Sequence, residues 1–151
     1  MSEDEDMLQV FIDGALRYFQ HASNADKVQM GTPYLVDNKK PAAYDFTGII
    51  GVSGPQKGCV YFSAPRVLLK HLLFSIGETD TSEDYIIDLV GEVANTISGN
   101  ARSVYGKSFM ISVPLVIQGA PDNIHLPKDA RSYVIPVYWK SYNAMVVICF
   151  E

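Results

Sequence analysis

The spacing of apolar residues between positions 83 and 105 places the strongest constraint on the fold of this 151-residue chain. At about 100° per residue, apolar side chains gather on one side of a helix over that span; they are Ile86, Leu89, Val90, Val93, Ala94, Ile97, Ala101 and Val104. On the opposite side, Asp88, Glu92, Asn95 and Gly99 fall within a sector of about 60°. The pattern predicts a long helix that packs one face on a core and presents an acid, an acid, an amide and a glycine on the other.

Composition narrows the class of protein. Hydrophobic residues make up 48% and charged residues 19% of the chain, which is typical of one globular domain spanning residues 1–151. The net charge of −5 argues against nucleic-acid binding through a basic surface. The longest apolar run, 144–150, is too short to cross a membrane, and the N-terminus is acidic where a secretory signal would be basic. We therefore expect a cytoplasmic protein without nucleic-acid or membrane binding.

Apolar periodicity and turn residues predict the remaining elements. Helices are expected over residues 7–22, from Pro65 to a stop at Gly77, and over 83–105, with Thr81 or Ser82 as the cap of the last. Strands are expected over 28–36 (interrupted at Gly31 to Pro33), 44–52, 59–63, 109–119 (marked by Pro114), 132–140 and 145–150, with a loop over 120–129 and a turn over 141–143. The predicted fold class is α+β, with three helices packed on a mainly antiparallel sheet of about six strands.

Cysteine and histidine give no metal-binding pattern. Cys59 and Cys149 lie in separate apolar runs without a C-x-x-C pair, which favours reduced, structural thiols. The three histidines lack the spacing of metal ligands. We expect the protein to have no metal or other cofactor of its own.

Two interpretations of the polar row remain open from the residues alone. An ordinary solvated helix face is the simpler one. However, no lysine or arginine lies between Lys70 and Arg102, and Asp88 and Glu92 repel each other mildly at one-turn spacing. Asparagine and glycine are poor choices inside a helix, and glycine costs about 1 kcal/mol there relative to alanine. Asn95 and Gly99 therefore favour the second interpretation, a surface that a basic partner approaches closely.

The run Asp88-x-x-x-Glu92-x-x-Asn95 resembles the D/S-x-x-x-E-x-x-N signature of the CheC/CheX/FliY phosphatases. The likeness extends to the opening helix, the strand–glycine turn–strand of 48–63, the helix after Pro65, and the strand of 111–114 with Gly119 after it. The first helix carries Arg17 where a second E-x-x-N would need its acid. With a single site, the chain is more similar to CheX than to two-site CheC.

The resemblance implies a CheC-like fold and a phosphatase that acts on an aspartyl-phosphorylated, CheY-like receiver domain in chemotaxis or related two-component signalling. It implies that Asn95 orients the attacking water, that Glu92 pairs with a receiver lysine, and that Asp88 and Gly99 belong to the contact surface. The Mg²⁺ would be the receiver's own. It also implies a homodimer, for which the apolar C-terminal strands are candidates, although Pro114 and Lys140 fit the protected edge of a monomer equally well. The alternative function is a noncatalytic adaptor of the same fold that binds a receiver or a flagellar or signalling partner.

Overall fold

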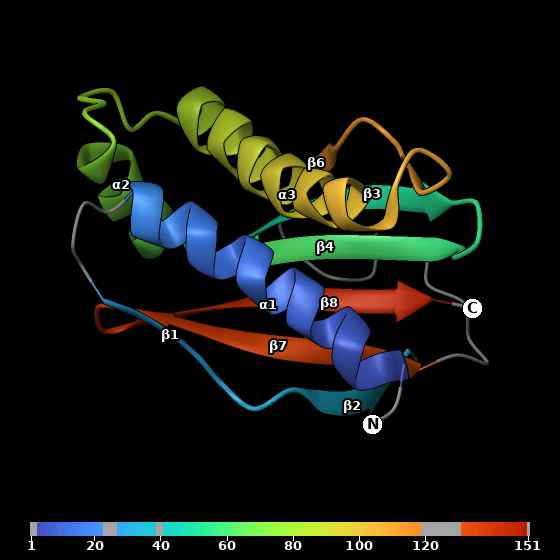
Figure 1. Ribbon diagram of the computed structural model, residues 1–151. Helices are drawn as coiled ribbons and strands as arrows, with labels where there is room; N and C mark the ends of the chain where they lie inside the picture. Colours follow the sequence, from blue (N-terminus) through green and yellow to red (C-terminus); the bar gives the residue numbers. More distant parts are fainter. Residues whose placement is uncertain (1–2, 23–26, 39–40, 119–130, 151) are drawn as a thin grey trace.

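The computed structural model describes residues 3–22, 27–38, 41–118 and 131–150. These residues form the helices α1 (Glu3–Ala22), α2 (Arg66–Ser75) and α3 (Glu83–Tyr105). They also form the strands β1 (Val28–Met30), β2 (Tyr34–Asp37), β3 (Phe46–Ser53), β4 (Gly58–Ala64), β5 (Met110–Ile111), β6 (Leu115–Gln118), β7 (Arg131–Trp139) and β8 (Tyr142–Phe150). The expected arrangement of three helices on an antiparallel sheet is confirmed (Figure 1).

The sheet has eight strands, two more than expected. Its order is β1-β7-β8-β4-β3-β5, while β2 also pairs with β7 and β6 with β3, and every pairing is antiparallel. The difference arises because the expected strands 28–36 and 109–119 are each divided in two. Proline cannot donate to a strand ladder, and Pro33 and Pro114 lie in the two breaks. The predicted loop over 120–129 lies outside the described residues.

The main core lies between the sheet and the helices. In Figure 1, α1 and α3 lie across the same face of the sheet, and α2 lies near one end of them. Alternate residues of the central strands, such as Phe62 and Val146, join this core, while their neighbours Tyr61 and Val147 belong to a smaller apolar cluster on the other face. The central strands are thus apolar on both faces, which explains the uninterrupted buried run 144–149 of β8.

Helix α3 packs closely on strand β3. A Cβ atom on Gly48 would lie 3.0 Å from the backbone oxygen of Val90 and 3.2 Å from Cβ of Ala94, so any larger residue would push the helix away by a few tenths of an ångström. Seven of the eight residues of the predicted stripe are buried; Val104, which is 60% exposed, is the exception. Val104 lies in the last turn of α3, where residues 102–105 are all exposed.

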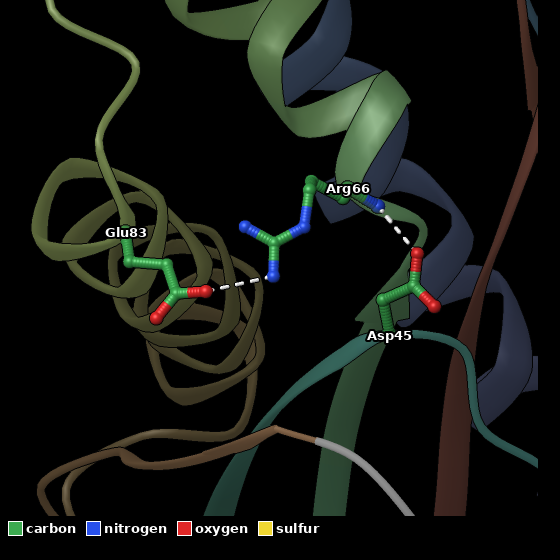
Figure 2. A network of polar contacts seen from close by, with 3 residues as sticks. All are labelled: Asp45, Arg66 and Glu83. Carbon is green, nitrogen blue, oxygen red and sulfur yellow. Dashed lines mark hydrogen bonds and ion pairs between the residues drawn. The ribbon is translucent and has the colours of Figure 1, made fainter.

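The first turn of α3 is tied to α2 and to the segment before β3, as Figure 2 shows. Nη2 of Arg66 lies 2.8 Å from Oε1 of Glu83, and the backbone N–H of Arg66 donates to Oδ2 of Asp45 at 2.9 Å. The arginine head also stacks 4.9 Å from the ring centre of Phe46. An exposed ion pair of this kind contributes about 0–1 kcal/mol, and here it links the first turn of α3 to the first residue of α2.

Three element ends differ from expectation. Helix α1 begins at Glu3, since acids such as Asp4 and Asp6 are favourable in a first turn and extend the helix into the acidic segment. Ser82 caps α3 without a side-chain hydrogen bond, and its own N–H donates to Oδ1 of Asp80 instead. The last hairpin turns at residues 140–141 rather than 141–143, with Lys140 in a left-handed conformation at φ 55°.

Candidate functional site

The polar row of α3 is exposed, as its spacing predicts. Asp88, Glu92 and Asn95 lie on the outer side of the helix, opposite the buried Leu89 and Val93. Among the described residues, none of these three polar side chains takes part in a hydrogen bond or an ion pair. Their carboxylate and amide groups are therefore available to another molecule.

A shallow depression of about 510 Å³ lies along one side of this row. It is lined by Ile87, Asp88, Gly91, Glu92, Asn95, Pro114 and Val116. Its floor is formed where α3 meets the edge of the sheet, because Gly91 has no side chain to separate the helix from Pro114 and Val116. Three of the four predicted site residues, Asp88, Glu92 and Asn95, thus share one hollow between a helix and an edge strand.

A larger groove of about 1080 Å³ lies on the other side of the row, between α3 and α1. The α1 wall includes Arg17, Tyr18 and Gln20, and the α3 wall includes Glu92 and Thr96. Glu92 borders both hollows. The outer face of α3 is therefore a ridge with a recess on each side, a convex shape suited to enter a concave site on another molecule.

Tyr18 lies close to Glu92 across this groove. Burial, and after it the negative charge of Glu92, raise the pKa of the Tyr18 phenol. The phenol therefore stays neutral at physiological pH. Tyr18 therefore adds no charge beside the Glu92 carboxylate.

Gly99 is the one predicted site residue outside both hollows. A Cβ atom there would meet no heavy atom within 4 Å, apart from the nearby backbone of its own helix and its chain neighbours, so no described segment requires a glycine. Sequence reasoning missed Gly91, the glycine of α3 that does pack against another segment. A glycine inside a strongly periodic helix was the available signal, since its cost of about 1 kcal/mol calls for a packing reason.

In α1, Asp13 and Arg17 lie where a second copy of the E-x-x-N motif was sought, and both form hydrogen bonds within the chain. Oδ1 of Asp13 accepts a hydrogen bond from Nε2 of Gln9 at 2.8 Å, and Nη1 of Arg17 donates to Oδ1 of Asn100 at 3.2 Å. Gln20 lines the groove beside them. In the part of the chain that the structure describes, no three His, Cys, Asp or Glu side chains are grouped to hold a metal ion, and no helix is long and apolar enough to cross a membrane.

The helix and sheet arrangement defines a protein of the CheC-like fold. A family model described as chemotaxis phosphatase CheX matches residues 46–138, a span that includes α3 and its polar row. The chain belongs to the CheX family.

Solved structures agree with this assignment. A CheC-like superfamily protein from Shewanella sp. PV-4 is 29% identical, with a TM-score of 0.82 over 100% of this chain and 99% of that one. CheX from Vibrio vulnificus is 20% identical, with a TM-score of 0.80 over 97% of this chain and 99% of that one. A CheX–CheY–BeF3–Mg²⁺ complex from Borrelia burgdorferi matches at 20% identity and a TM-score of 0.76, over 95% of this chain and 97% of that one. No curated protein matches the sequence.

Proposed function

We propose that this protein is a phosphatase that hydrolyses the aspartyl phosphate of a CheY-like receiver domain. The observation that carries the proposal is the ridge of α3, where Glu92 and Asn95 lie about one turn apart, exposed and without partners among the described residues. Membership of the chemotaxis phosphatase family and the likeness to a CheX that is complexed with CheY support a receiver as the partner. The pathway is chemotaxis or a related two-component circuit.

Asn95 is the residue to which we assign the chemical role. Its amide does not titrate, and its oxygen and N–H groups can hold a water molecule in line with the bond to be broken. The water oxygen bonds to phosphorus as the bond from phosphorus to the receiver's aspartate oxygen breaks. The products are inorganic phosphate and a free aspartate carboxylate, and the water's proton leaves with the phosphate or to solvent. The contribution of Asn95 is orientation.

Glu92 and its neighbours position the two proteins. The Glu92 carboxylate pairs with a lysine ammonium of the receiver, and Asp88 adds negative charge to the same contact surface. Gly99 leaves the ridge low at its C-terminal end, where the receiver surface passes. Mg²⁺, which we assign to the receiver, neutralises charge on the phosphoryl oxygens, so this chain needs no metal of its own.

The test is the decay of a phosphorylated receiver in the presence of wild-type protein and of Asn95→Ala. The substitution should return the decay to the receiver's own rate and leave binding almost unchanged, because it removes the water-orienting amide and little contact area. Asn143→Ala is the matched control, since Asn143 is an exposed asparagine of β8 that lines neither hollow. Full phosphatase activity in Asn95→Ala would exclude this mechanism. Binding of receivers by wild-type protein without faster decay would instead support the noncatalytic adaptor.

We also propose a homodimer formed through the sheet, although not by edge pairing of the C-terminal strands. β8 is paired with β4 and β7, and β7 is paired with β8 as well as with β1 and β2. The outer edges instead carry exposed apolar residues, Leu35 on β2 and Met110 and Leu115 at β5 and β6. Light scattering of the purified protein decides between monomer and dimer.

A further inference from the structure

The α1 wall of the larger groove has no part in the chemistry assigned to α3, yet it carries a charge of the opposite sign. Arg17 lies on this wall and Glu92 on the facing one. No lysine or arginine occurs in α3 before Arg102, in its last turn. A partner that enters the groove therefore meets a cation on one side and an acidic helix on the other.

Arg17 is held in place without losing its charge. Its Nη1 donates to Oδ1 of Asn100, and the same asparagine donates through Nδ2 to the backbone oxygen of Val10 at 3.3 Å. In the described ranges Arg17 forms no ion pair, and its side chain is exposed. A guanidinium has five N–H donors in a planar fork, so one bond to an amide leaves donors for a carboxylate.

A receiver seated on the α3 ridge has carboxylates close to this position. A site that carries Mg²⁺ next to a phosphorylated aspartate needs hard oxygen ligands, which in proteins are mainly Asp and Glu. The groove adjoins Glu92, and the phenol of Tyr18, the next residue along α1, responds to the charge of Glu92. Arg17 and Glu92 line the same groove, so a receiver that engages Glu92 brings the border of its phosphorylation site to the groove that Arg17 lines.

We propose that Arg17 binds an acidic side chain beside the phosphorylation site of the receiver, and that the groove between α1 and α3 thereby determines which receivers dock and in which orientation. This inference rests on the proposed phosphatase function. A positive wall and a negative wall accept only a partner that presents its carboxylate toward α1 and its lysine toward α3, because the reversed orientation places like charges together. Arg17 is accordingly a specificity residue, and no step of the hydrolysis passes through it.

The test compares steady-state dephosphorylation by wild-type protein, Arg17→Glu, Arg17→Gln, Arg17→Lys and Lys57→Glu, with a phosphorylated CheY-like receiver that the wild type dephosphorylates. Lys57→Glu is the matched control, because it makes the same change in net charge at an exposed site between β3 and β4 that lines neither hollow. Arg17→Glu should raise KM about tenfold or more and leave kcat within about twofold, since a fixed charge contact of about 1.4 kcal/mol corresponds to a factor of ten. Arg17→Gln should be intermediate, while Arg17→Lys and Lys57→Glu should remain near the wild type.

Rescue identifies the contact on the receiver. Receivers in which one acidic residue beside the phosphorylation site, other than a ligand of the Mg²⁺, is changed to lysine should recover a low KM with Arg17→Glu and lose it with the wild type. An unchanged KM in both Arg17→Glu and Arg17→Gln, or an equal rise in Lys57→Glu, would overturn the proposal. These outcomes are separate from failure of the phosphatase function itself, which would appear as no acceleration by the wild type or no effect of Asn95→Ala.

Discussion

Gly91 and Val116 bring helix α3 into contact with the edge of the sheet: a Cβ atom on Gly91 would lie 3.4 Å from Cγ2 of Val116. That is an ordinary van der Waals distance, so a methyl group fits here, whereas a longer side chain would extend into the hollow beside the polar row. The contact forms the floor of the depression that Asp88 and Asn95 share. The size of residue 91 therefore decides how deep this hollow is.

Gly91→Ala should stabilise the protein, whereas Gly91→Leu should impair the site. Alanine is favoured over glycine inside a helix by about 1 kcal/mol, and its methyl group meets no atom closer than 3.4 Å. We expect a higher melting temperature and normal receiver dephosphorylation for Gly91→Ala. Leucine would fill the hollow and weaken receiver binding. Thermal unfolding and a binding titration measure the two effects, and equal affinity for both variants would show that the receiver does not use this hollow.

Reversing the charge of Glu92 should weaken both binding and catalysis. Glu92→Lys places two ammonium groups together at the proposed contact, and we expect a loss of at least about tenfold in affinity and a lower rate at saturation. Asp84→Lys is a suitable control, because Asp84 is an exposed acid of the first turn of α3 that lines neither hollow. Similar losses in both variants would indicate a general effect of net charge rather than a lysine contact.

Gly99→Ala tests whether a partner surface passes over the end of the ridge. Among the described residues, no atom outside the helix lies within 4 Å of the added methyl group, so the isolated protein should gain up to about 1 kcal/mol of stability from helix propensity. If the receiver backbone approaches here, the same methyl group raises KM while stability increases. Greater stability with an unchanged KM would remove Gly99 from the contact surface.

High pH should destabilise the fold through Cys59. Burial, and next the neighbouring sulfur of Cys149, raise the pKa of the Cys59 thiol to about 12. The folded protein therefore keeps this thiol neutral above pH 9, where an unfolded chain ionises it, and the free energy of unfolding falls as the pH rises from about 9 toward 12. Urea unfolding at several pH values should give a slope that is smaller in Cys59→Ala by up to about 1.4 kcal/mol per pH unit. Identical slopes would contradict the raised pKa.

Periodicity was sufficient to predict the helices, and apolar runs bounded by turn residues were sufficient for most strands, because the central strands are apolar on both faces. The sequence also indicated the breaks at Pro33 and Pro114, but not that the pieces are separate strands on the outer edges of the sheet. Strand order depends on contacts between distant residues, such as Cys59 opposite Cys149. Local sequence patterns do not reveal such contacts. The same limit explains why the apolar C-terminal strands were candidates for a dimer contact, since an apolar run indicates burial without saying what buries it.

The polar row was predictable for a different reason. Its residues are neighbours on a single helix, so their relative positions follow from their spacing alone. The hollows beside it were not predictable, because Pro114 and Arg17 reach the row only through tertiary packing. Gly91 was overlooked because it lies between the apolar stripe and the polar row, and its contact with Val116 and Pro114 arises only from tertiary packing.

The placement of Asp88, Glu92 and Asn95 on two turns of one continuous helix has a consequence for how this protein can diversify. Their mutual geometry is carried by backbone hydrogen bonds within α3, so it survives changes in the rest of the chain that preserve that helix. The recesses on either side come from other elements, α1 and β6, and can be reshaped independently. The surfaces beside the polar row can therefore change while its three side chains keep their arrangement, so substitutions in α1 or β6 alter the recesses without altering the row.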